Sequence, residues 1–128
     1  MKTMYMKAKR IITIILTAIS SGMVILSGLM KLSGSPEVTQ ALTNAGVGPY
    51  IPMLGIMELV FAGLFLYPKT MKVGFLLLCC YFAGAIAAEL SHNGPYSNAI
   101  LVQVLIWVAA FLRDPSIFLP TSPVRPSL

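Results

Sequence analysis

The sequence predicts an all-α integral membrane protein, a four-helix bundle with a short external interfacial helix, formed as a single domain over residues 1–128. Three observations predict it. Hydrophobic residues make up 57% of the chain and charged residues 10%, which is outside the range of soluble globular proteins. Four apolar runs follow one another, and the basic residues gather at alternate junctions between them. Residues 115–128, rich in proline and serine, are expected to be an irregular tail.

The four apolar runs are the predicted membrane spans. Each approaches or reaches the roughly 17 to 25 residues that a helix needs to cross a hydrocarbon core about 30 Å thick. They cover residues 11–30, 50–67, 73–91 and 96–112. The first run, preceded by basic residues and interrupted by Ser20-Ser21-Gly22, also fits a cleavable signal peptide. Its continuation to Met30 favours a span.

The placement of the basic residues predicts a topology. Only Lys31 lies in a loop on the opposite side from the others, so the positive-inside rule puts both termini in the cytoplasm. The net charge of +5 is not gathered on one soluble face, so we expect a lipid bilayer and no nucleic acid as partner. The remaining basic residues are Lys2, Lys7, Lys9, Arg10, Lys69, Lys72, Arg113 and Arg125.

The loop between the first two runs carries its own helix signals. Ser35 is a candidate N-cap, Pro36 suits the first helical position, Glu37 places an acid in the first turn, and Gly46 can end the helix. We therefore predict a short helix over residues 36–45. Its apolar edge would lie on the mouth of the bundle as a lid, or at the level of the lipid headgroups.

Glu58 lies almost at the midpoint of the second run and is the only ionisable residue in it. An acid at the centre of a bilayer helix is unfavourable by roughly 2.5 to 3.5 kcal/mol, so Glu58 needs a partner, a proton or a wet cavity. Its functional interpretation is a proton relay. The structural alternative is a protonated carboxyl, or one hydrogen-bonded to Ser27 or Gln103, that fixes the register of the helices.

Other polar side chains fall at depths where they can meet Glu58. Lys31, Glu89 and His92 lie near the external end of their spans and Gln103 lies somewhat deeper, so together they can line one polar pocket that opens outward. Two alternatives stay open: Glu89 and His92 can form an interfacial pair, and Gln103 can serve helix packing.

Two stripes at helical spacing predict helix contacts. A hydroxylated stripe in the first span faces other helices or lines a pocket. Its members are Thr13, Thr17, Ser20, Val24, Ser27 and Lys31. Cys80, Gly84 and Ala88 form a small-residue stripe suited to tight contact, which leaves room for a homo-oligomer. Cys79 and Cys80 are interpreted as small buried apolar residues.

Several chemistries are excluded by the residues themselves. The single histidine cannot form a bis-histidine haem site or a convincing nucleophile-base-acid triad, and no cysteine-histidine spacing predicts a metal site. A glycine-rich phosphate-binding loop follows a strand, and the sequence predicts no strand, so this kind of site is excluded as well. Three functions remain possible. They are proton transfer through Glu58, binding of a small apolar or quinone-like ligand between helices, and scaffolding of a partner.

The order of several short patterns resembles the DoxX and DoxX-like family. The patterns are Ser27-Gly-Leu-Met-Lys-Leu32, Leu54-Gly-Ile-Met-Glu58, Ala62-Gly63, Pro68-Lys69, Gly84-Ala85, His92 and Leu112-Arg-Asp-Pro115. The resemblance implies a four-helix protein of the bacterial cytoplasmic membrane in which Lys31, Glu58 and His92 match recurring polar positions. Family members are linked to quinone-dependent oxidation of sulfur compounds. For this chain we expect no covalently bound redox group, so the cofactor that the resemblance implies is a quinone.

The resemblance and the polar residues lead to two hypotheses, neither of which decides whether the chain is itself an enzyme. In the first, the chain is an accessory subunit of a quinone-linked or redox membrane system, and a redox enzyme subunit is its partner. Glu58 then relays protons or binds a quinone, while Lys31, Glu89, His92 and Gln103 line the pocket. In the second, it is a non-enzymatic carrier of a small solute, or a factor that assists assembly of membrane proteins.

Overall fold

The computed structural model describes residues 2–120, which contain helices and no strand. The residues of the tail from 121 onward, Arg125 among them, lie outside the described residues. In chain order the helices are α1 (Lys2–Ser33), α2 (Pro36–Asn44), η1 (Gly48–Tyr50), α3 (Ile51–Leu66), α4 (Met71–Ser91), α5 (Ser97–Arg113) and η2 (Pro115–Ile117). The start of the expected irregular tail is therefore a short 3-10 helix, η2.

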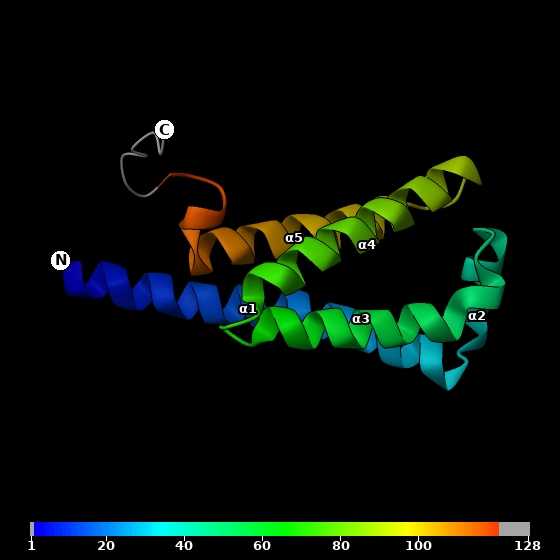
Figure 1. Cartoon of the computed structure of the whole chain (residues 1–128), viewed down its shortest axis with the longest axis horizontal. Coiled ribbons are helices and arrows are strands. Elements are labelled where there is room, and N and C mark those ends of the chain that lie inside the picture. The colour runs from blue at the N-terminus through cyan, green and yellow to red at the C-terminus, as the bar shows by residue number, and fades with distance from the viewer. Residues whose placement is uncertain (1, 121–128) are drawn as a thin grey trace, which may run out of the picture.

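The four long helices close into a bundle. α1 packs against α3 and α5, and α4 packs against the same two helices, so each helix has two neighbours. α2 lies across one end of the bundle (Figure 1). The predicted all-α, four-helix architecture with a short additional helix is confirmed.

Length and apolar composition make this a multi-pass membrane protein. Three segments of the described chain are long and apolar enough to cross a bilayer: α1, residues Gly48–Leu66, and α4. α5 is shorter, with 17 residues or about 26 Å. Large apolar side chains such as Ile14, Val60, Leu76 and Leu101 are exposed on the outside of the bundle, where lipid would cover them.

The short helix predicted over residues 36–45 is confirmed and covers Pro36–Asn44, and its role as a lid stays a prediction. Gly46 follows its C-cap with φ of +83°, and the Val47 amide donates to the Leu42 carbonyl, which together form a glycine-terminated helix end. Ser35 occupies the N-cap, but its side chain makes no capping hydrogen bond, so proline at the first position and not the serine hydroxyl defines the start.

The densest core lies in the half of the bundle away from α2. Its fully buried side chains come from all four long helices: Val24, Ala62, Phe65, Leu78, Ile106, Ala109 and Ala110. Ser20 and Ser21 are also buried within an unbroken α1, so cleavage of a leader at this point would remove part of the packed structure. The hydroxylated stripe of α1 thus faces inward, as predicted.

Glycines set the spacing between helices. α1 and α3 cross closely where Gly28 and Gly55 meet, since a Cβ on either glycine would lie 3.0 Å from the carbonyl oxygen of the other. Gly74 of α4 lies directly against the backbone of Phe65 on α3. From there α4 diverges from α3 toward the end that carries α2 (Figure 1).

The small-residue stripe of α4 does not make the predicted tight helix contact. Cys80 and Gly84 are exposed, and a Cβ on Gly84 would have no atom within 4 Å outside its own helix. The stripe borders open space because α4 has already separated from α3 at this level. Cys79 is half-buried and Cys80 exposed, so only the first fits the interpretation as a packing residue.

Candidate functional site

Glu58 lies near the midpoint of α3 on its inward face. Gly55 and Ala62, at helical spacing on either side of it, are buried as well, so the small residues allow α1 to approach the carboxyl closely. The side chain of Glu58 is only 1% exposed. A carboxyl buried at this depth requires a partner.

Lys31 is that partner. Its Nζ lies 2.9 Å from Oε1 of Glu58 and also donates to Oγ of Ser27 at 2.7 Å, one helical turn earlier on α1. Ser27 in turn donates to the same Oε1 at 3.3 Å. The lysine side chain is 8% exposed, so both ends of the ion pair are withdrawn from solvent. The pair joins α1 to α3 and supplies the positive charge that Glu58 needs.

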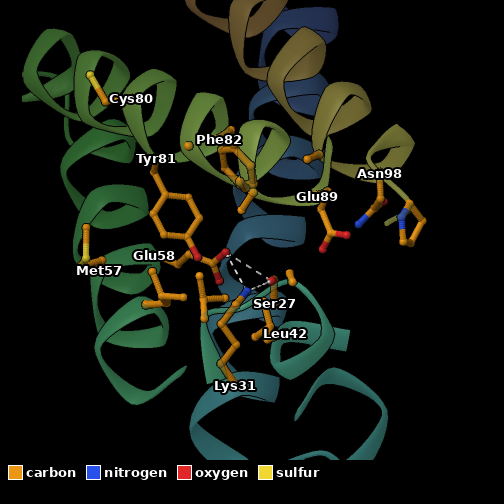
Figure 2. A pocket seen from close by; sticks show the side chains of 18 residues that line it. Ser27, Lys31, Leu42, Met57, Glu58, Cys80, Tyr81, Phe82, Glu89 and Asn98 are labelled. Carbon is orange, nitrogen blue, oxygen red and sulfur yellow. Dashed lines mark hydrogen bonds and ion pairs between the residues drawn. The ribbon is translucent and has the colours of Figure 1, made fainter. Parts of the chain in front are cut away.

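The ion pair forms part of the wall of a cavity of about 380 Å³ (Figure 2). α1 contributes Ser27 and Lys31, α3 contributes Glu58, and α4 contributes the longest wall. Most of the lining is apolar. It includes Leu42, Ala45, Leu54, Met57, Phe82, Ala85 and Ala88. An apolar cavity with a few convergent polar groups is the usual form of a small-molecule site.

Tyr81 is a site residue that the sequence reasoning missed. It lines the cavity from α4, and its hydroxyl points toward the Glu58 carboxyl (Figure 2). A signal was present in the sequence: tyrosines of membrane helices concentrate at the interfaces, whereas Tyr81 lies halfway along a 21-residue span. A tyrosine hydroxyl at that depth needs a polar neighbour, just as the carboxyl does.

One acceptor in the site remains without a donor. Both hydrogen bonds to the carboxyl converge on Oε1, while Oε2 of Glu58 is buried and has no hydrogen-bond partner among the described residues. The ammonium group of Lys31 has three protons, of which two are used in these contacts.

Glu89 lies at the mouth of the cavity, beside Asn98 of α5 (Figure 2). It also lines a second hollow, of about 620 Å³, between α2 and the turn that joins α4 to α5. His92 lines this second hollow only, as does Glu37. Glu89 is therefore the predicted site residue that connects the mouth to the surface of the protein.

Two of the predicted residues lie apart from Glu58. His92 follows the end of α4, where its Nδ1 lies 2.9 Å from Oγ of Ser91 and its ring lies against Gly46; it forms no ion pair with Glu89. Gln103 does not line the cavity: its Nε2 donates to the Cys79 carbonyl at 3.5 Å across the α4–α5 contact. The structure thus groups Lys31, Glu58 and Glu89 around one cavity and gives Gln103 a place in helix packing.

The described residues contain no cluster of three or more histidine, cysteine, aspartate or glutamate side chains that could hold a metal ion. The chemistry that the cavity itself can perform is hydrogen bonding and proton exchange through Glu58, Lys31 and Tyr81. Its donors and acceptors are surrounded by apolar surface, where they interact more strongly than in water.

Comparison with curated proteins gives no match, and comparison with solved structures gives none. A model of the DoxX-like family matches residues 15–112. The match begins within α1 and ends within α5, so it contains α3 and α4, most of α1 and α5, the lid helix and the whole cavity lining. By this match, which extends over most of its length, the chain belongs to the DoxX-like family.

Proposed function

We propose that this DoxX-like protein is an accessory subunit of a quinone-linked redox system, and that it binds a quinone in the cavity beside Lys31 and Glu58. The observation that carries the proposal is the polar group of Ser27, Lys31 and Glu58, buried in the wall of an otherwise apolar cavity. A quinone has an apolar body and polar oxygen atoms, so its chemistry matches the apolar lining and the buried polar group of the cavity.

The cavity suits such a ligand in size and in hydrogen bonding. Its volume of about 380 Å³ lies within the usual range for small-molecule sites, about 300 to 1,000 Å³. The unused proton of Lys31 and the hydroxyl of Tyr81 can donate to a ligand carbonyl, while Leu54, Met57 and Phe82 contact the apolar body. A bound quinone would supply the electron carrier that the side chains of the chain lack.

The position of the opening supports a ligand that arrives through the bilayer. Cys80 and Gly84 line the cavity and are exposed, and both lie on the middle part of α4. This stretch of α4 is at hydrocarbon depth if the helix spans the membrane. A lipid-soluble molecule can enter there without crossing water.

Glu58 is proposed to exchange protons between the ligand and the mouth. Lys31 supplies the counter-charge 2.9 Å from this carboxyl, which lines the cavity on the ligand side. Glu89 lines both hollows and is placed to continue the exchange toward the surface, near His92. In the proposal, Glu58 exchanges the proton with the ligand, and Glu89 passes it on toward the surface.

A solute carrier is the competing function, and the packing of the bundle argues against it. On the far side of Glu58 from α2, the space between the described helices is filled by fully buried side chains, including Phe65, Leu78 and Ile106. A carrier would need these groups to separate. The cavity is therefore better suited to holding a ligand than to passing one across the membrane.

Quinone retention tests the proposal. The full chain is purified in a mild detergent from membranes that contain quinone, and the extracted quinone is quantified. Gly84→Leu should lower it about tenfold or more, because the new side chain enters open space in the cavity without meeting another helix. Gly63→Leu is the matched control, since Gly63 also faces open space but lies outside the cavity, and it should retain wild-type quinone. Absence of quinone from the wild-type protein, both as purified and after incubation with quinone-loaded vesicles, would refute the proposal.

The orientation is proposed to place both termini in the cytoplasm of a bacterial cell, with α2 and the cavity mouth on the outer side. The observation behind it is the charge distribution, since Lys31 is the only lysine or arginine at the α2 end of the described bundle. In a cysteine-free background, single cysteines at Ser35 and at Thr70 should react with an impermeant label from opposite sides of the membrane. Labelling from the same side contradicts the topology.

A further inference from the structure

The first part of α1 stands apart from the rest of the protein. Every residue from 2 to 12 is exposed, and Leu16 is the first apolar residue of the described chain that packs against the core. We call residues 2–12 the N-terminal arm. The arm extends beyond the other long helices at the end of the bundle opposite α2 (Figure 1). It lines no part of the cavity and lies outside residues 15–112, which the family model matches, so it belongs neither to the core nor to the candidate site.

One side of the arm is apolar and continues the lipid-facing side of α1. Spacings of three and four residues place a stripe on this side: Met4, Ala8, Ile11, Ile15 and Ile19. Ile15 and Ile19 are half-exposed on the outside of the bundle, where lipid would cover them. The stripe therefore extends a surface that suits lipid past the end of the bundle.

The other side of the arm is basic and has no counter-charge. Its cations are Lys2, Lys7, Lys9 and Arg10. No acidic residue precedes Glu37 in the chain, and none of the four cations forms an ion pair with a described residue. Two arms of like charge would repel each other, which argues against a second copy of the chain as the partner. The partner of the arm is therefore expected to be anionic.

The depth of the basic residues identifies the anionic partner. The predicted span begins at Ile11, and the headgroup layer adds about 5 to 7 Å on each side of the hydrocarbon core, which is about four residues of helix. Lys7, Lys9 and Arg10 lie within four positions of Ile11, so the phosphates of the lipid headgroups are the anions within their reach. Basic residues at this depth are attracted to anionic lipids.

The apolar stripe can reach the same layer without a kink in the helix. α1 is unbroken from Lys2 to Ser33, and its lipid-facing side, from Met4 to Leu29, is about 38 Å long at about 1.5 Å per residue. This length exceeds a hydrocarbon core of about 30 Å, and a membrane helix accommodates such an excess by tilting. A tilt that moves the arm away from the bundle axis turns its apolar side toward the bilayer, because that side already faces outward.

We propose that the N-terminal arm is a binding element for anionic lipids. Its cations contact phosphate headgroups, while the stripe through Met4 and Ala8 lies at the boundary between headgroups and acyl chains. A bilayer of zwitterionic lipids has no net charge and holds the arm less firmly. The inference goes beyond the proposed function and is independent of the ligand in the cavity.

The experiment follows the arm of the full chain in nanodiscs of two compositions. A spin label is attached at Tyr5→Cys in a cysteine-free background, because Tyr5 is 71% exposed and lies near the free end of the arm. One nanodisc contains phosphatidylcholine alone, and the other also contains the anionic phosphatidylglycerol. The label should be mobile in the first. In the second it should be immobilised, and its collisions with a water-soluble nickel complex should fall about threefold or more, because the arm enters the interface.

Two pairs of substitutions test the charges. Lys7→Gln with Lys9→Gln should remove most of the response to phosphatidylglycerol. Lys69→Gln with Lys72→Gln is the matched control, since it removes the same charge from the same end of the bundle, and it should keep the response. Equal behaviour of the wild-type label in the two nanodiscs, or equal loss with both pairs, overturns the inference. A label that stays mobile in both nanodiscs and is immobile in native membranes also overturns it, because the arm then binds a protein.

Discussion

Gly74 and Gly84 lie ten positions apart on α4 and have opposite surroundings. At Gly74 the helix lies against the backbone of α3, whereas at Gly84 a Cβ would have no neighbour within 4 Å. The same helix thus forms part of a closed core at one end and of the cavity wall at the other. The comparison teaches that a glycine in a membrane helix marks close packing only where the helix axes converge, and four predictions test the difference between the two ends.

The largest effect is expected at the cavity end, where packing is thin and a single ion pair joins α1 to α3. Lys31→Met should lower the free energy of unfolding by about 3 to 5 kcal/mol, because it leaves Glu58 buried without a counter-charge. Unfolding in mixed micelles measures the change. Adding Glu58→Gln to the same chain should recover part of the loss, and the exposed Lys69→Met is the control. A loss no larger than that of the control would mean that the pair does not hold this end together.

At the closed end, Gly74→Ala should cost about 2 to 3 kcal/mol, since its methyl group would overlap the Phe65 backbone and force α3 and α4 apart. Gly84→Ala is the matched change on the same helix. It should leave stability unchanged or raise it by up to about 1 kcal/mol, because alanine is the better helix former and the space is open. Equal effects of the two variants on the melting temperature would remove the contrast between the ends.

Substitution of Arg113, also at the closed end, is expected to have the next largest effect on stability. Its guanidinium donates to the carbonyls of Phe65 and Leu66 in the last turn of α3 and lies 4.9 Å from the centre of the Phe65 ring. Arg113→Met should lower the free energy of unfolding by about 2 kcal/mol, because helix-terminal carbonyls lose their donor. The exposed Arg10→Met should change it little. Hydrogen exchange should rise in the last turn of α3 and stay unchanged around Glu58.

The smallest effect concerns Asp114, just beyond α5. The hydroxyl and amide of Ser116, together with Lys72, hold the pKa of this carboxyl below its ordinary value. A carboxyl with a lowered pKa stabilises the folded state fully above its ordinary pKa of about 4, and this contribution is lost as the pH falls through the lowered value. Ser116→Ala should therefore reduce the melting temperature slightly at pH 7, and the reduction should shrink as the pH is lowered below the ordinary pKa of the carboxyl. The same reduction above and below that pKa would show that the serine acts in another way.

Much of the fold could be predicted from the sequence because it depends on local pattern and on the solvent. Apolar runs of membrane-spanning length fix the number and type of the long helices, and proline and glycine at either end fix the lid helix over Pro36–Asn44. Glu58 could also be identified as a site residue from the sequence, because an acid buried in hydrocarbon has a high free-energy cost. Lys31, four positions after Ser27 on an inward-facing stripe, was correctly grouped with it.

The sequence could not place residues whose role depends on how far apart two helices are. Gln103 had two interpretations, lining the pocket or helix packing, and the rotation of α5, which turns it to the Cys79 carbonyl, favours packing. Tyr81 was missed, because only the divergence of α4 brings its hydroxyl toward Glu58 (Figure 2). The same divergence leaves the small-residue stripe without a tight contact at Gly84 inside the chain, and the homo-oligomer for which it leaves room stays a prediction.

By itself, therefore, the sequence determined that this chain forms apolar helices around a carboxyl that needs a partner. Helical periodicity and the transfer of side chains into hydrocarbon are properties of single segments, so they can be evaluated from one segment at a time. Only the tertiary structure decided that Lys31 is the partner of Glu58, that Tyr81 points toward the same carboxyl, and that a cavity lies beside it. These features depend on the tilt and rotation of whole helices, which are set by contacts between segments distant in the sequence.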